Sequence, residues 1–245
     1  MQRQKPTQPL RKLFADYRAN LYDEEIRSDW GSALIYRPVG LIFAWLLSAT
    51  SITPSAVTAT GALLLPLMIA VLYFCQPPTA LVIVLALAII YLILDCTDGS
   101  LARATGQVSV SGHYWDLVTD LAYRGCIYGS VGYLADQIYP WPFPVSHMSC
   151  MAFAAWLALL ARLARASLDK LAPPGTGEND GQNGATSFTV YSFLSGMDTL
   201  LPLLTAIAAF LGVLSIYVAW IVFYSFADVF VALVEARRRL KPYQN

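Results

Sequence analysis

Long apolar stretches, separated by short polar connections, run through most of this 245-residue sequence. Six of them reach about 20 residues, the length that a helix needs to cross a hydrocarbon core about 30 Å thick. They lie near residues 55–74, 79–101, 114–138, 146–168, 186–210 and 213–235. No alternating strand pattern competes with them, and open sheet edges cannot face lipid. The sequence therefore predicts an all-α integral membrane protein with six transmembrane helices.

The segment before the first span has a different character. Residues 10–30 mix both charge signs with apolar side chains, whereas residues 38–51 are mainly apolar. A seventh span at 38–51 would place the basic N-terminal arm on the outer face of the membrane, so we predict a cytoplasmic interfacial amphipathic helix there instead. The predicted organisation is a cytoplasmic arm with interfacial helices at 1–52, a six-helix membrane domain at 53–238 and a cytoplasmic tail at 239–245.

Composition and charge agree with a membrane protein. Hydrophobic residues make up 57% of the chain and charged residues only 13%, which is outside the range of ordinary globular domains. Nearly all lysines and arginines fall on one side of the predicted spans, so both termini are expected to be cytoplasmic. The net charge is zero, which gives no indication of a nucleic-acid partner. The four cysteines lack metal-binding spacing and are predicted to be free thiols.

Four aspartates stand out in this apolar chain. Asp95 and Asp98 are three residues apart at the cytoplasmic end of the second span, and Asp116 and Asp120 are four apart at the start of the third. Both spacings place each pair on one helix face, and the short turn between the spans makes the two helices antiparallel neighbours. Converging carboxylates repel one another unless a cation lies between them. Oxygen-only ligation suits Mg²⁺ or Mn²⁺, and four carboxylates can hold two ions that clamp a diphosphate.

Small residues and one arginine share this region. Gly99 and Ala102 follow the first aspartate pair within about a turn, and Gly112 lies one turn before the second pair, so both helix faces leave room for a ligand. Arg103 is placed to face phosphate charge. Charged helix ends that simply face water are the plain alternative, but they do not explain why small residues share these faces.

The full pattern resembles the signature of the CDP-alcohol phosphotransferase, or CDP-alcohol phosphatidyltransferase, family. Eight specified positions are filled at the family's spacing: Asp95, Asp98, Gly99, Ala102, Arg103, Gly112, Asp116 and Asp120. Residues 52–61, ITPSAVTATG, also resemble the family's entry to the first span, with Ser55 in place of the usual Asn. The resemblance implies a metal-dependent displacement of CMP from a CDP-linked alcohol by the hydroxyl of a second alcohol. It also implies a homodimer.

The resemblance assigns roles to these positions. It implies that Asp95, Asp98 and Asp116 hold the metal ions, and that Asp120 shares a metal and serves as the general base. The depth of Asp120 supports its second role, because a base has to reach the incoming hydroxyl. His113, at the start of the same helix, is the rival base. The residues implied to bind CDP are Gly99, Ala102, Arg103, Gly112 and Thr58.

Three arginines are candidates for the acceptor site. Arg124 lies one turn after Asp120 within the membrane, where an unpaired charge is costly, so it either contacts a polar acceptor or forms an ion pair. Its candidate partners are Asp120, Asp198 and Asp228. Arg162 and Arg165 either complete a basic wall or extend to lipid headgroups. The sequence leaves open whether Asp198 and Asp228 are functional carboxylates or interhelical partners.

The substrates are less well determined by the sequence than the chemistry. Members of the resembled family that transfer to glycerophosphate typically carry a Lys after the last aspartate and a Gly-Lys-rich stretch before the fifth span. Here Leu121 and residues 184–190 (GATSFTV) stand at those places, so the resemblance disfavours a glycerophosphate acceptor. Because the predicted site opens at the cytoplasmic membrane surface and no soluble substrate domain is evident, we expect transfer of a phosphatidyl group from CDP-diacylglycerol to a small polar alcohol. One alternative is transfer of a choline- or ethanolamine-type head group from a soluble CDP-alcohol to diacylglycerol. A remote alternative is a divalent-cation transporter or a non-catalytic membrane scaffold.

Overall fold

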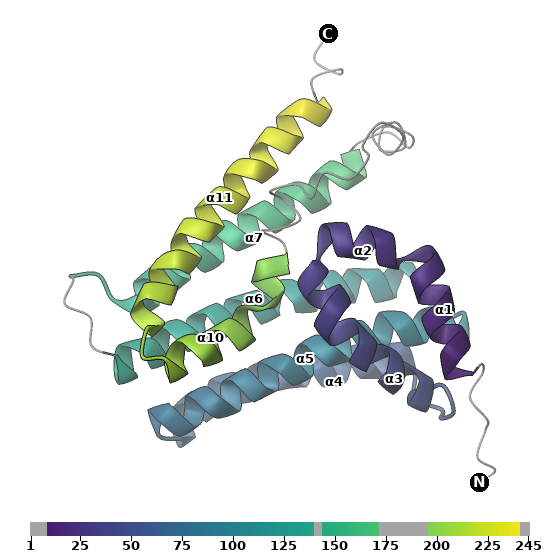
Figure 1. The fold of residues 1–245 in the computed structure, drawn as a ribbon, viewed down its shortest axis with the longest axis horizontal. Coiled ribbons are helices and arrows are strands. Elements are labelled where there is room, and N and C mark those ends of the chain that lie inside the picture. The colour runs from purple at the N-terminus through teal and green to yellow at the C-terminus, as the bar shows by residue number, and fades with distance from the viewer. Residues whose placement is uncertain (1–8, 140–143, 172–195, 241–245) are drawn as a thin grey trace.

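The computed structural model describes residues 9–139, 144–171 and 196–240, and every regular element within these ranges is a helix. In chain order they are α1 (Leu10–Asn20), α2 (Tyr22–Ser28), the π-helical segment η1 (Ser32–Tyr36), α3 (Arg37–Leu47), α4 (Pro54–Phe74), α5 (Pro77–Thr105), α6 (Val110–Ile138), α7 (His147–Leu171), α10 (Leu201–Phe210) and α11 (Leu214–Leu240). The predicted all-α class is therefore confirmed for the described part of the chain (Figure 1).

Four helices of the described part are long and apolar enough to cross a membrane. They are Pro54–Phe74, Pro77–Thr105, His147–Leu168 and Leu214–Val234, and they indicate an integral membrane protein. They correspond to the first, second, fourth and sixth predicted spans. The third predicted span corresponds to α6, which is as long as α5 but carries several charged residues. The fifth falls partly on residues 186–195, outside the described ranges, and its last part is α10.

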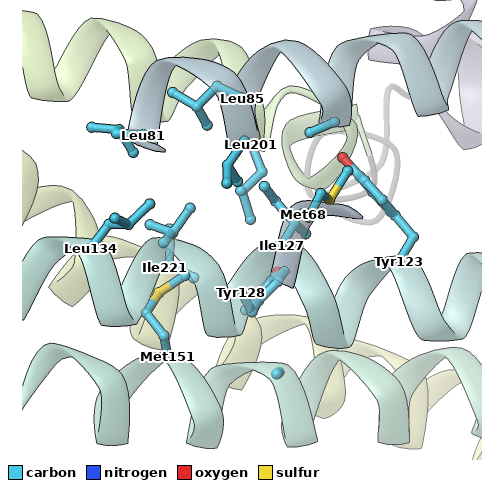
Figure 2. Packing of buried hydrophobic residues seen from close by; sticks show 14 of the residues in the cluster. Met68, Leu81, Leu85, Tyr123, Ile127, Tyr128, Leu134, Met151, Leu201 and Ile221 are labelled. Carbon is cyan, nitrogen blue, oxygen red and sulfur yellow. The ribbon is translucent and has the colours of Figure 1, made fainter. Parts of the chain in front are cut away.

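The long helices pack side by side as a bundle. α5 lies along α4, α6 packs on both α4 and α7, and α11 packs along α7 (Figure 1). Their shared core consists of aliphatic and aromatic side chains, among them Met68, Leu85, Ile127, Met151 and Ile221 (Figure 2). The α4–α5 and α10–α11 connections lie at one end of the bundle, and the α5–α6 turn lies at the other (Figure 1).

Two sets of contacts fix α7 against its neighbours. Gly132 of α6 lies so close to α7 that a Cβ there would be 2.9 Å from the Met148 Cα. The ring of His147 bridges two helices, because its Nδ1 is 2.8 Å from Asp136 Oδ1 of α6 and its Nε2 is 2.8 Å from the Ser215 hydroxyl of α11. Asp136 also accepts hydrogen bonds from the backbone N–H groups of His147 and Met148, which caps the first turn of α7.

The N-terminal arm, which comprises α1, α2, η1 and α3, covers the end of the bundle where α5 ends and α6 begins (Figure 1). α3 crosses α5 at close range, because a Cβ on Gly40 would lie only 2.7 Å from the Cys96 Cβ. A small second core, with Leu13, Leu41 and Leu101 among its members, joins the arm to α5. The predicted helix at 38–51 is thus observed as α3, which ends at Leu47, while its interfacial position stays a prediction.

The turn between α5 and α6 is short and capped on both sides. α5 ends at Gly106, whose φ of 68° is the left-handed conformation that favours glycine, and the Gln107 N–H donates to the Ala102 carbonyl at 2.8 Å. α6 begins after Ser109, whose hydroxyl accepts a hydrogen bond of 3.0 Å from the Gly112 N–H. These caps hold the ends of the two motif-bearing helices next to each other.

Candidate active site

A cavity of about 320 Å³ opens between α4, α5, α6 and the α5–α6 turn, and we call it the large cavity. Its volume lies at the lower end of the range for small-molecule sites, roughly 300–1,000 Å³. Thr58, implied by the resemblance to bind CDP, lines it, and so does His113. Seven of the eight motif positions also belong to its wall: Asp95, Asp98, Gly99, Ala102, Arg103, Gly112 and Asp116. The structure therefore brings both halves of the motif to one place.

Three carboxylates reach this cavity without a counter-charge bonded to them. Asp98 is buried, and its Oδ2 accepts a hydrogen bond of 2.5 Å from the Thr58 hydroxyl. In the described part of the chain, no ion pair includes Asp95, Asp98 or Asp116. Carboxylates that share a partly buried wall in this way repel one another, so the wall is suited to a cation.

The donor set fits Mg²⁺ or Mn²⁺ in kind, because the ligands that the wall offers are carboxylate oxygens. Among the described residues, no three acidic, histidine or cysteine side chains lie close enough together to form a ready metal cluster. An ion bound between α5 and α6 would therefore require these side chains to turn toward it. The metal ligands, and the number of ions, stay a prediction.

Asp120, the eighth motif position, lies outside the wall of the large cavity. Its carboxylate is held by two arginines: Oδ1 is 3.4 Å from Arg124 Nη2, and Oδ2 is 3.0 Å from Arg162 Nη2. One helical turn separates it from Asp116, whose side chain does line the cavity. Asp120 therefore stands between the large cavity and the arginines predicted for the acceptor.

All three predicted acceptor arginines line a second and much smaller cavity of about 20 Å³, which we call the arginine cavity. Arg124 forms an ion pair with Asp198. Arg165 forms a bidentate pair with Asp228, with an Nη2–Oδ1 distance of 2.5 Å and an Nη1–Oδ2 distance of 3.2 Å. A cavity of this volume holds about one water molecule, so a substrate alcohol could enter only if some of these pairs opened.

The two later aspartates, whose role the sequence leaves open, take part in these contacts. Asp198 and Asp228 are interhelical ion-pair partners, and the Tyr128 hydroxyl also donates to Asp198 Oδ1 at 2.8 Å. Arg162 differs from the other two arginines, because its side chain is 44% exposed and its ion pair is with Asp120. Of the three arginines, it is the one most accessible to a ligand.

Replacement of Arg124 by glutamine is expected to destabilise the fold, because it removes the charge that neutralises the largely buried Asp198. Breaking one side of a buried ion pair typically costs about 3–5 kcal/mol. Thermal unfolding of the purified protein in detergent would show the loss as a lowered midpoint. The double variant R124Q/D198N removes both charges and should recover part of the stability. Equal midpoints for wild type and R124Q would contradict the pairing.

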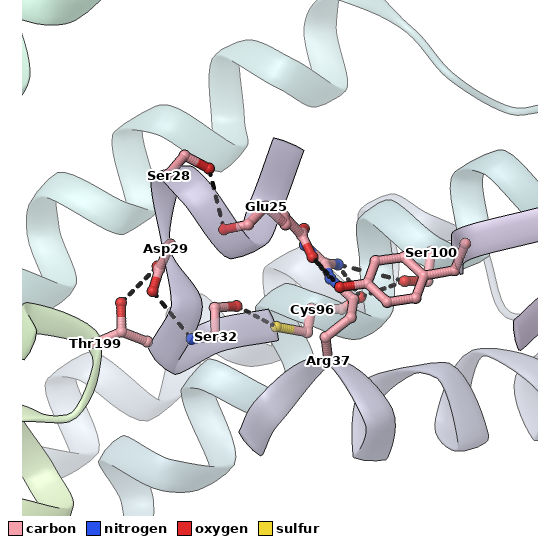
Figure 3. A network of polar contacts seen from close by, with 9 residues as sticks. Glu25, Ser28, Asp29, Ser32, Arg37, Cys96, Ser100 and Thr199 are labelled. Atoms are coloured by element: carbon pink, nitrogen blue, oxygen red, sulfur yellow. Dashed lines mark hydrogen bonds and ion pairs between the residues drawn. The ribbon is translucent and has the colours of Figure 1, made fainter. Parts of the chain in front are cut away.

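One charged residue of the arm lines the large cavity and another lies near two arginines of the arginine cavity, although no sequence signal distinguished them from the other charges around them. Arg37 lines the large cavity. Asp29 accepts hydrogen bonds from the Thr199 hydroxyl at 2.6 Å and from a backbone N–H at 3.0 Å (Figure 3). Burial raises the pKa of the Asp29 carboxyl, while these hydrogen bonds and the charges of Arg124 and Arg162 oppose that rise. The arm thus reaches toward both cavities.

Comparison with known proteins supports the resemblance to this family. A family model described as CDP-alcohol phosphatidyltransferase matches residues 51–226, which is more than half of the chain. The matched range begins just before α4, includes every motif position and ends within α11, whereas the N-terminal arm lies outside it. No curated protein matches the chain.

Proposed function

We propose that this chain, which belongs to the CDP-alcohol phosphatidyltransferase family, transfers a phosphatidyl group from CDP-diacylglycerol to the hydroxyl of a small polar alcohol and releases CMP. Members of the family are transferases that take a phosphate-linked group from a CDP-alcohol. The observation that carries the proposal is the placement of seven motif positions around the large cavity, with the arginine cavity beyond Asp120.

The large cavity is the proposed donor site. Asp95, Asp98 and Asp116 would hold Mg²⁺ or Mn²⁺, which would neutralise charge on the diphosphate and make CMP a better leaving group. The remaining wall supports a nucleotide in two ways. Gly99, Ala102 and Gly112 leave room for it, and Arg103 supplies positive charge. Thr58 holds the Asp98 carboxylate in place through its hydroxyl.

Asp120 is the proposed general base. The acceptor oxygen attacks the phosphorus of the phosphatidyl group, and the bond from that phosphorus to the bridging oxygen breaks, so that CMP leaves with the electron pair. The hydroxyl proton passes to the Asp120 carboxylate. The position of Asp120 beyond the wall of the large cavity supports this role, because a base there faces the incoming alcohol rather than the nucleotide. His113 is exposed at the start of α6 and is the weaker candidate.

The arginine cavity is the proposed entry point of the acceptor. A polar alcohol that displaced the ion pairs of Asp120 would meet Arg124 and Arg162, and Arg165 would complete the basic side of the cavity.

The proposal places the reaction at the cytoplasmic surface of a six-span protein with both termini on that side. Support comes from the basic residues of the sequence, which gather at that end of the predicted spans. A homodimer is proposed from the family resemblance alone.

The test is CMP release by purified protein in detergent with Mg²⁺ or Mn²⁺ and CDP-diacylglycerol. We expect release to depend on one acceptor from a panel of glycerol 3-phosphate, serine, inositol and inositol 1-phosphate. Product formation from CDP-choline or CDP-ethanolamine with diacylglycerol, and none from CDP-diacylglycerol, would reverse the donor assignment. Divalent-cation uptake into vesicles without CMP release from either donor class would contradict the enzymatic function itself.

A further inference from the structure

The N-terminal arm contributes a cation to the wall of the large cavity from outside the family-matched range. Arg37 begins α3, fourteen residues before the matched range starts at residue 51, yet it lines the cavity together with Asp95 and Asp98. Its side chain is only 13% exposed. A charge this poorly solvated needs strong local partners, and the structure shows them on two sides.

On the side of the arm, the guanidinium of Arg37 is held by Glu25 of α2. Nε donates to Glu25 Oε2 at 3.0 Å, and Nη2 forms an ion pair with Glu25 Oε1 (Figure 3). Glu25 Oε2 also accepts a hydrogen bond of 2.7 Å from the Tyr17 hydroxyl of α1. A fork-to-fork pair of this kind fixes the plane of the guanidinium before any ligand arrives.

On the side of the bundle, Arg37 contacts the turn of α5 that carries the first aspartate pair. Nη1 donates to the Cys96 carbonyl at 2.9 Å and lies 3.4 Å from the Ser100 hydroxyl (Figure 3). The close approach of Gly40 to Cys96 keeps α3 against the same turn. Arg37 therefore sits at the level of the carboxylates, which is the end of the cavity where a diphosphate would bind, rather than at the α5–α6 turn.

We propose that Arg37 is a further donor-site residue whose guanidinium contacts the diphosphate of the CDP-linked donor. The proposal rests on the proposed function for its donor class. Arginine suits the role because it stays charged and offers planar N–H donors to phosphate oxygens. Its contacts leave one Nη2 N–H without a partner among the described residues. The arm is then part of the donor site and not only a cover for the bundle.

The test compares CDP, which carries the diphosphate, with CMP, which does not. Calorimetric titration in detergent with Mg²⁺ would measure the affinity of each nucleotide for the wild type and for Arg37→Gln. We expect the glutamine variant to lose about tenfold or more in CDP affinity, which is the loss of one charge-assisted hydrogen bond, and clearly less in CMP affinity. Arg37→Lys keeps the charge and should retain most of the preference for CDP.

Arg27→Gln is the matched control, because Arg27 is an exposed arginine of α2 that lines neither cavity. A variant of Arg37 that loses CDP and CMP affinity equally would overturn the proposal, since a purely structural role of the arm affects both nucleotides alike. Unchanged affinities would also overturn it. If Arg37→Gln fails to purify as a monodisperse protein, Arg37→Lys carries the test: a loss of CDP affinity that exceeds its loss of CMP affinity supports the contact, and equal losses of the two refute it. A wild type that binds neither nucleotide would instead refute the proposed function.

Discussion

Replacement of Asp98 by asparagine is expected to abolish CMP release while the protein still inserts and folds. Asparagine keeps the shape of the side chain and can still accept the hydrogen bond from the Thr58 hydroxyl, so the packing around it should survive. The substitution removes one of the negative charges that would hold a divalent ion against the diphosphate. A bound metal contributes several kcal/mol to such a reaction, which corresponds to a loss of about a thousandfold or more in turnover.

The measurement is the initial rate of CMP release at saturating acceptor, with size-exclusion chromatography to confirm that Asp98→Asn is folded. Asp23→Asn is the matched control, because Asp23 is an exposed carboxylate of α2 that lines neither cavity. The control should keep the wild-type rate. Turnover of Asp98→Asn within tenfold of the wild type would remove the metal-site assignment.

Replacement of Asp120 by asparagine is expected to lower kcat by at least about a hundredfold, the lower range for loss of a general base. Because Asp120 does not line the large cavity, CDP affinity should stay close to that of the wild type. Asparagine keeps the shape of the side chain, and its one amide oxygen can still contact either Arg124 or Arg162, so part of the pairing is retained. A large loss of turnover with intact nucleotide binding is therefore the distinguishing result.

His113→Gln is the comparison that tests this division of roles. His113 lines the large cavity but is exposed, so its loss should reduce turnover much less than the loss of Asp120. A larger effect of His113→Gln than of Asp120→Asn would transfer the base role to the histidine. Loss of CDP binding in Asp120→Asn would show instead that Asp120 acts in donor binding.

The helical elements were predictable where apolar length decides the structure. Residues 55–74 and 79–101 were expected to span the membrane, and they form α4 and α5 with bounds only a few residues wider. Such segments cannot satisfy their backbone in lipid except as helices. The packing of the arm was harder to predict than its helices, because it depends on particular contacts such as the close approach of Gly40 to Cys96. Its packing on α5 has no signature in the sequence.

The candidate site was likewise predictable from the sequence only in part. Seven motif positions could be placed together from their spacing, since residues three or four apart share a helix face and a short turn makes the helices neighbours. The contact of Asp120 with Arg162 could not be predicted from the sequence, because α7 approaches α6 only in the folded bundle. Arg37 was missed for the same reason, since Glu25 and Cys96 meet it only in three dimensions.

The capped turn at residues 106–109 also constrains the length of the interval between the two halves of the motif. Gly106 ends α5 and Ser109 caps the start of α6, so the connection between the two helices has little slack. Each residue added to a helix rotates the rest of that helix by about 100°. An insertion within the turn would separate its two caps and leave the angular phase of Asp116 relative to Asp98 unspecified. We therefore expect homologous chains to differ in length at the opposite end of the bundle. In the α5–α6 turn we expect substitutions but neither insertions nor deletions.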